Sequence, residues 1–230
     1  MNLTRLKQEL DKLKNPGKAK ILARFFKTGK GEYGENDKFL GIIVPDQRSI
    51  AKKYKDLSLF EIKKLLSSPW HEHRLTGALI LTYKYPKADN KKEIVDFYLK
   101  NSHAFNNWDL VDLTAPNIIG DYLLDKDRSV LYKLAKSNNL WTKRIAILAT
   151  FAFIKQGDFI DCLRISKILL KDKHDLIHKA VGWMLREAGK RDIKVLKKFL
   201  DQNIKQMPRT MLRYAIERLP EKRRQFYLKK

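Results

Sequence analysis

Apolar residues recur at helical spacing along almost the whole chain. A first set predicts a helix that stops at the Asn15-Pro16 pair: Leu3, Leu6, Leu10 and Leu13. A second set predicts another helix after that proline: Ile21, Leu22, Phe25 and Phe26. Such spacing places each set on one helix face. No segment alternates between apolar and polar residues as a half-buried strand would, so the pattern predicts an all-α protein.

Two local signals refine this pattern. Ser58 and Glu61 stand three residues apart ahead of an apolar run, which predicts a capping box at a helix start. The segment Thr28–Lys38 contains three glycines among polar residues. We therefore expect a flexible loop over residues 28–38.

Four apolar segments repeat at an interval of 35 residues. They begin at Arg74 (RLTGALILTY), Asp109 (DLVDLTAPNI), Arg144 (RIAILATFAF) and Lys179 (KAVGWMLREA). Shorter helical stretches lie between them: Lys91–Lys100, Ser129–Lys136 and Asp161–Leu170. One long and one short helix in every ~35–45 residues is typical of helical solenoids such as HEAT arrays. We predict a single HEAT-like superhelical domain over residues 1–230, with a plain helical bundle as the alternative.

Stacked helix pairs curve, and the curve produces a concave surface. If the repeated helices line that surface, equivalent cationic positions face one groove. These positions are Arg74, Arg144 and Lys179, with Arg209 and Arg213 in a looser C-terminal copy. We therefore expect a concave basic groove that binds the backbone of double-stranded DNA.

The charge of the chain also points to nucleic acid. Lys and Arg total 49 against 26 acidic residues, and this formal net charge of +23 favours an anionic partner. A face of solvated lysines is one alternative, and a coat on an anionic membrane is another. The charge is spread over every segment rather than gathered on one helix, which argues against the membrane.

Composition predicts a compartment as well. Cys162 is the only cysteine, so an intramolecular disulfide is excluded and a reducing environment is suitable. No apolar run approaches the ~20 residues that span a bilayer. Met1–Leu13 lacks the apolar centre of a signal peptide. We expect a cytoplasmic monomer that does not bind a membrane.

The histidines do not complete a metal site. His174 and His178 are four residues apart, but no cysteine or HExxH pattern supplies further ligands. His71 and His73 are two apart and would diverge on a helix. We expect neither a metal nor another cofactor.

The segment Asn106–Asp112 is the strongest candidate for chemistry. Trp108 and Asp112 are four residues apart, so they share one face of a helix. Pro116 is expected to end or kink that helix, leaving the Asp112 carboxylate near a helix C-terminus, where it is electrostatically disfavoured. A residue placed against its local preference points to function. The alternative is that Asp112 caps a short helix that starts near Ala115.

Two further candidates follow at the repeat interval. Arg144 lies one repeat later and Trp183 one further, so a solenoid would bring both to the concave face of Trp108 and Asp112. A tryptophan within a helix is more often part of the core. That alternative stands for both tryptophans.

Three strings of the chain are long and contain rare residues: NNWDLVDLTAP (Asn106–Pro116), LWTKRIAIL (Leu140–Leu148) and HKAVGWMLRE (His178–Glu187). With them the chain resembles the AlkD-like branch of the DNA alkylation repair family. The resemblance extends from about Pro16 to Leu219. It implies a HEAT-like superhelix that removes cationic alkylated purines from DNA.

The resemblance also implies roles for individual residues. The family pattern has a Trp and an Asp four apart, then an Arg and a Trp in the next two repeats. Trp108, Asp112, Arg144 and Trp183 match it one by one. Phe25, which we assign to the DNA-binding surface, departs from the family because it stands at an apparent tyrosine position. Any hydroxyl contact made there would be lost.

These residue types suit a monofunctional DNA glycosylase. An N3- or N7-alkylated purine is already cationic and leaves without prior protonation. Asp112 would stabilise the developing oxocarbenium sugar and orient a water. Trp108 and Trp183 would attract the cationic base and sugar, and Arg144 would hold a phosphate. No lysine is assigned as a nucleophile, so we expect no lyase step.

Two other functions remain as alternatives. One is a HEAT-like protein that binds distorted or branched DNA without catalysis. The other is a scaffold for an acidic protein, which would show no salt-sensitive affinity for DNA.

Overall fold

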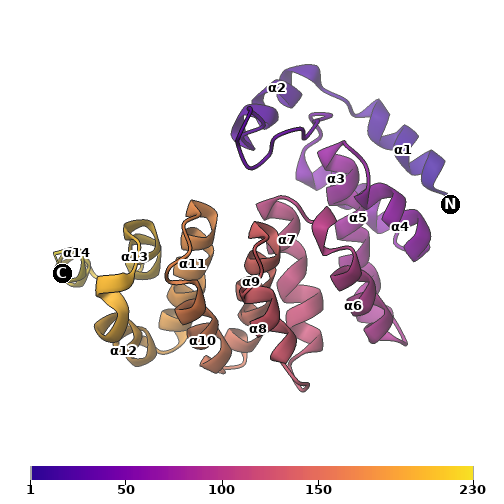
Figure 1. Cartoon of the computed structure of the whole chain (residues 1–230). Coiled ribbons are helices and arrows are strands. Elements are labelled where there is room, and N and C mark those ends of the chain that lie inside the picture. Colours follow the sequence, from indigo (N-terminus) through magenta and orange to yellow (C-terminus); the bar gives the residue numbers. More distant parts are fainter. Residues whose placement is uncertain (1, 230) are drawn as a thin grey trace. The chain divides into compact units, whose positions relative to one another are not determined.

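The computed structural model describes residues 2–229, which form an all-helical fold (Figure 1). The chain divides into two compact units, Met1–Thr114 and Ala115–Lys230. The helices of the first unit are α1 (Leu3–Lys12), α2 (Pro16–Phe25), α3 (Val44–Lys53), α4 (Leu59–Leu66), α5 (His71–Lys84), η1 (Tyr85–Lys87), α6 (Lys91–Lys100) and η2 (Ser102–Ala104). Helix α7 (Trp108–Ala115) ends at the boundary between the units.

The second unit continues with helices throughout. They are η3 (Pro116–Gly120), α8 (Ser129–Ala135), α9 (Leu140–Lys155), α10 (Ile160–Leu169), α11 (Asp175–Arg191), α12 (Ile193–Asn203), η4 (Ile204–Gln206), α13 (Arg209–Ile216) and α14 (Glu221–Leu228). Within residues 2–229 the extended pairing is limited to one isolated bridge, between Lys38 and Trp70.

Helix α5 forms the centre of the first unit. Its first eleven residues, His71–Leu81, are all buried, and the helix packs against α3 and α4.

The predicted capping box is confirmed at α4, where Ser58 and Glu61 each bond the backbone of the other. In α1, Leu6 and Leu10 of the predicted leucine stripe are fully buried. Burial of such an apolar stripe supplies most of the stability of a short helix.

From α8 to α12 the second unit alternates short and long helices. The long helices α9 and α11 pack on each other, and α13 packs on α11 (Figure 1). The shorter α10 packs on both α9 and α11. Gly182 permits the close approach of α11 and α13, since a Cβ there would lie 2.5 Å from the Met211 carbonyl oxygen. This stacking confirms the predicted helical-repeat fold of all-α class.

The 35-residue interval is also confirmed, because its four segments begin inside α5, α7, α9 and α11. The three shorter stretches correspond to α6, α8 and α10 within one residue at each end. Thr28–Asp37 contains neither helix nor strand, as expected for the predicted loop. The single domain over 1–230 and the concave basic groove stay predictions.

The second predicted helix is found as α2, but its apolar residues are covered unevenly. Ile21 is 68 % exposed and Phe25 is 61 % exposed. Leu22 is half-buried, and Phe26, just beyond the helix, is buried. Helical spacing shows that residues share a face, but it does not show that another element covers that face.

Two further findings concern the helices and the single cysteine. Among the described helices, none is both long and apolar enough to cross a membrane. Cys162 is buried, and burial raises the pKa of its thiol to about 12. The thiol is therefore protonated at neutral pH.

Candidate functional site around helix α7

Helix α7 carries the Trp–Asp pair that the sequence singled out. Trp108 and Asp112 stand one turn apart in the helix, and both side chains are half-buried. Neither residue is therefore sealed in the core. A tryptophan is rarely buried completely even in a core, so the assignment of Trp108 to a site rather than to the core stays a prediction.

Asp112 lies in the last turn of α7 and has no capping position. The π-helical segment η3 (Pro116–Gly120) follows α7 directly, and Ala115 has helical backbone angles without a side-chain cap. The interpretation of Asp112 as the cap of a second helix is therefore wrong, because a capping residue has an extended backbone. The prediction that Pro116 ends or kinks the helix is confirmed, because the α-helical pattern stops at Ala115 and a π-helical segment begins at Pro116. The wider π turn accommodates a proline that cannot donate to the Asp112 carbonyl.

An aromatic cluster supports Trp108. The Phe26 ring stacks on the Trp108 ring at 5.2 Å, and the exposed Phe25 ring meets Trp108 edge-on at 6.0 Å. Phe26 also contacts Phe39 at 5.2 Å and the His71 ring at 4.8 Å. Trp108 is thus packed on one side and partly exposed, with Phe25 beside it. Paired aromatic faces suit a cationic or planar partner.

Beneath these rings lies a buried charge cluster of Asp37, His71, Arg74 and Asp109. His71 Nε2 is 2.8 Å from Asp109 Oδ2, and His71 Nδ1 is 3.5 Å from Asp37 Oδ2. Arg74 Nη2 forms an ion pair with the same Asp37 oxygen at 2.7 Å. Two carboxylates thus face two cations. Buried charges are tolerated when they are paired in this way.

The His71 imidazole is held in its charged form. Burial opposes protonation, but the charge and hydrogen bond of Asp109, together with the contact to Asp37, raise the pKa of His71 to about 9. The Asp37 carboxyl is also buried, yet hydrogen bonding to His71 and the charge of Arg74 keep its pKa below the ordinary value. At neutral pH His71 therefore donates from both ring nitrogens.

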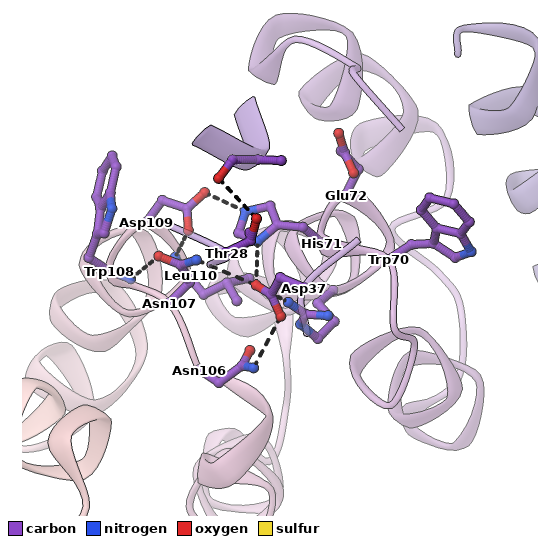
Figure 2. A network of polar contacts seen from close by, with 12 residues as sticks. Thr28, Asp37, Trp70, His71, Glu72, Asn106, Asn107, Trp108, Asp109 and Leu110 are labelled. Carbon is purple, nitrogen blue, oxygen red and sulfur yellow. Dashed lines mark hydrogen bonds and ion pairs between the residues drawn. The ribbon is translucent and has the colours of Figure 1, made fainter. Parts of the chain in front are cut away.

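The loop that enters α7 is attached to this cluster. The side-chain amide nitrogens of Asn106 and Asn107 each donate to Asp37 at 3.5 Å, and the side-chain Oδ1 of Asn107 accepts from the Trp108 backbone N–H at 2.8 Å (Figure 2). Asp109 Oδ1 accepts from the Leu110 N–H at 2.8 Å. Three side chains therefore link the start of α7 to Asp37 and His71.

A cavity of about 390 Å³ lies beside the cluster, within the first unit. Its apolar wall includes Ile21, Leu22 and Phe39, while His71 and Asp109 stand at its polar side. The poorly covered face of α2 borders this cavity.

The structure corrects the assignment of Arg74 to a DNA-binding surface. Arg74 is 4 % exposed, and its Nη1 donates to the Ser68 carbonyl at 2.8 Å while Nη2 pairs with Asp37. Its guanidinium group is buried and bonded to Ser68 and Asp37, so it is not accessible to a phosphate. Arg74 does stand at the start of a repeated helical segment, but its side chain points into the interior of the first unit.

Arg144 has a similar environment in the second unit. It is 5 % exposed, and its Nη1 donates to the Leu176 carbonyl at 2.6 Å. The side chain thus joins α9 to α11, and a phosphate contact would require the guanidinium to become exposed. That contact stays a prediction, since no DNA is bound here.

The remaining candidates lie nearer to solvent. Lys179 has a side chain 38 % exposed and pairs with Asp175 one turn earlier at 2.8 Å. Arg213 is exposed on α13. Trp183 is half-buried, with its ring 6.1 Å from that of Phe151. Their convergence with Trp108 and Asp112 on one face stays a prediction.

The charge cluster is not predicted by the sequence pattern, in which His71 stands only as a poor metal ligand and Asp109 only as the start of a repeat. A signal was present, because His71 and Asp109 are 38 residues apart, close to one repeat, and each stands in the first turn of a repeated helix. Asp37, in the irregular loop, carried no such signal. Across the described residues, no three His, Cys, Asp or Glu side chains are placed to hold a metal ion.

The raised pKa of His71 predicts a pH-dependent stability. Because the folded pKa of about 9 exceeds the ordinary value of 6.5, the folded state binds this proton more tightly than the unfolded state. The contribution is fully present below pH 6.5 and is lost as the pH rises through 9. We expect the free energy of unfolding to fall by about 3 kcal/mol over this range.

Urea unfolding at a series of pH values measures this loss. His71→Gln should flatten the curve between pH 6.5 and 9. His73→Gln is the matched control, because burial and then the charge of Lys7 lower the pKa of His73 to about 4. That histidine affects stability only as the pH falls below 6.5. An alkaline loss of stability that survives in His71→Gln would contradict the assignment.

The stacked helix pairs make this a helical-repeat protein. Its candidate site combines polar and aromatic residues and contains the half-buried pair Trp108 and Asp112. The model of the DNA alkylation repair enzyme family matches residues 6–219, and the chain belongs to that family. The family implies a role in the repair of alkylated DNA, with DNA as the partner.

A solved structure shares the fold. It is described as a predicted DNA alkylation repair enzyme from Enterococcus faecalis, and it superposes with a TM-score of 0.71 at 16 % identity. The match covers 90 % of this chain and 97 % of that chain. No curated protein matches the chain.

Proposed function

We propose that this protein is a monofunctional DNA glycosylase that releases cationic N3- and N7-alkylated purines from duplex DNA. The observation that carries the proposal is the pair Trp108 and Asp112, one turn apart on α7 and both half-buried, in a chain of the DNA alkylation repair enzyme family. A carboxylate beside an aromatic face suits a substrate whose base and transition-state sugar both carry positive charge.

The reaction would need little from the protein beyond electrostatics and a positioned water. As the N-glycosidic bond breaks, its electron pair leaves with the cationic purine, which departs as a neutral base. The sugar becomes an oxocarbenium ion, which the Asp112 carboxylate stabilises. Water then bonds to C1′ of the sugar, and its proton passes to Asp112 or to solvent. No lysine is needed, so the product is an intact strand with an abasic site.

The other proposed residues would bind rather than react. Trp183 offers a second half-exposed aromatic face in the second unit, and Lys179 and Arg213 offer accessible cations. Phe25 adds an exposed ring beside Trp108. We propose that the protein acts as a cytoplasmic monomer.

The direct test is release of the modified base. Duplex DNA with a single N7-methylguanine is incubated with the protein, and free base and abasic sites are both measured. We expect release well above the spontaneous rate in a control with heat-denatured protein. Borohydride should trap no covalent protein–DNA adduct. Tight binding without release would favour the non-catalytic binder of distorted DNA and contradict the proposal.

Affinity for duplex DNA is expected to depend steeply on salt. Counterion release from several neutralised phosphates gives a log–log slope steeper than about −4. Arg213→Ala should reduce that slope by about one unit, whereas Arg213→Lys keeps the charge and should keep the slope. Fluorescence anisotropy over a range of salt concentrations measures both. A flat dependence would contradict a phosphate-binding surface.

A further inference from the structure

The start of α7 is fixed by side chains from distant parts of the first unit. Asp109, in the first turn, bonds His71 at the start of α5, and Asn106 and Asn107 reach Asp37 in the loop that follows α2. Asp37 is in turn paired with Arg74. The buried charge cluster therefore ties three segments together where α7 begins.

The same cluster supports the Trp108 ring. The His71 imidazole contacts Phe26 at 4.8 Å and Phe39 at 4.8 Å, and Phe26 stacks on Trp108 at 5.2 Å. His71 is thus connected to Trp108 in two ways. It bonds the side chain of Asp109, the residue after Trp108 in α7, and its ring contacts Phe26, which stacks on Trp108. A movement of the imidazole would therefore shift both the start of α7 and the Trp108 ring.

We propose that the buried charge cluster of Asp37, His71, Arg74 and Asp109 is a positioning device for Trp108 and Asp112, with protonated His71 as its central member. This inference rests on the proposed function for its catalytic consequence, but the positioning itself is a property of the protein without DNA. None of the four residues needs to touch the substrate. They would act by fixing α7, because a displacement of about 1 Å in a reacting group costs up to about 10²-fold in rate.

The charged groups on the elements packed around His71 together favour its protonated form. Asp109 of α7 and Asp37 of the loop stabilise the imidazolium, while Arg74 of α5 opposes it. Glu72, the next residue of α5, is directed instead to the backbone of the Leu40–Ile42 segment. Loss of the His71 proton would leave Asp37 and Asp109 facing only one cation. The attachment of α7 should then loosen.

The first experiment uses the protein without DNA and reads the environment of Trp108. The fluorescence of Trp108 is obtained by subtracting the spectrum of Trp108→Phe from that of the wild type. We expect this signal to titrate with a midpoint near pH 9, while circular dichroism shows unchanged helix content. A signal that is flat from pH 7 to pH 10 would overturn the proposal. This titration does not require His71→Gln to fold, and circular dichroism of Trp108→Phe checks the variant that is subtracted.

The second experiment compares two histidine variants. His71→Gln removes the central cation, whereas the control His73→Gln changes another buried histidine of α5, bonded to Ser68 at 2.9 Å outside the cluster. In His71→Gln we expect an altered Trp108 signal that no longer titrates, and single-turnover base release about ten- to a hundredfold slower at unchanged DNA affinity. His73→Gln should match the wild type in both.

The outcomes separate this inference from the proposed function. A Trp108 signal that titrates in a protein with no base release supports the positioning device and contradicts the glycosylase. Base release that is equally fast in wild type and folded His71→Gln, with an unchanged Trp108 signal, overturns the positioning device and leaves the glycosylase standing.

Discussion

Asp112→Asn should slow release of N7-methylguanine by about 10²–10³-fold under single-turnover conditions. The amide is nearly isosteric with the carboxylate, so the variant should fold. It lacks the negative charge opposite the developing oxocarbenium ion and is a poor acceptor for the proton of the attacking water. Affinity for duplex DNA should be retained or slightly increased, because one negative charge leaves a surface that faces phosphates. Rate and affinity are measured separately, by base release and by anisotropy.

Asp121→Asn provides a matched control for this experiment. Asp121 is an exposed carboxylate on the helical segment that follows η3, and the same isosteric change there should leave the rate unaltered. If Asp112→Asn releases base at the wild-type rate, Asp112 is not the catalytic carboxylate and the mechanism is wrong. If it fails to fold, Asp112 has a structural role in α7.

Glu72→Ala should destabilise the protein by on the order of 4 kcal/mol. The Glu72 carboxylate is 1 % exposed and accepts three backbone hydrogen bonds, from Leu40 at 2.9 Å, Gly41 at 2.8 Å and Ile42 at 3.2 Å. Removing it leaves three buried N–H groups without an acceptor. The backbone has little room to adapt, because Gly41 has a φ of +83° and a Cβ there would lie 2.1 Å from the Asn15 carbonyl oxygen.

Urea unfolding measures this loss against two comparison variants. Glu72→Gln keeps one carbonyl oxygen in place and should cost less than Glu72→Ala. Glu61→Ala removes the α4 capping box at a partly exposed site and should cost only about 1 kcal/mol. Equal effects of Glu72→Ala and Glu61→Ala would show that the Leu40–Ile42 segment does not need its buried carboxylate.

The sequence alone determined the class of fold and its period. The interval between Arg74, Asp109, Arg144 and Lys179 located four helices, and the Ser58–Glu61 capping box located the start of another. These features are local, because helical periodicity and capping depend on residues three or four positions apart. The pairing of Trp108 with Asp112 on one face of α7 follows from the same geometry.

The tertiary structure decided what each face of those helices meets. It placed Arg74 and Arg144 inside the units rather than on an exposed surface, and it left Ile21 and Phe25 of α2 uncovered. A repeat shows that positions are equivalent, but the neighbouring element decides whether an arginine meets solvent, a carboxylate or a backbone carbonyl.

The buried charge cluster likewise required the folded chain. Asp37, His71 and Asp109 come from a loop and two helices, and each one alone reads as an ordinary polar residue. Their pairing depends on contacts between residues 34 and 38 positions apart, which no local pattern encodes. Helical spacing along the sequence determines which residues share a face of α7, whereas only the packing of three distant segments shows what holds that helix in place.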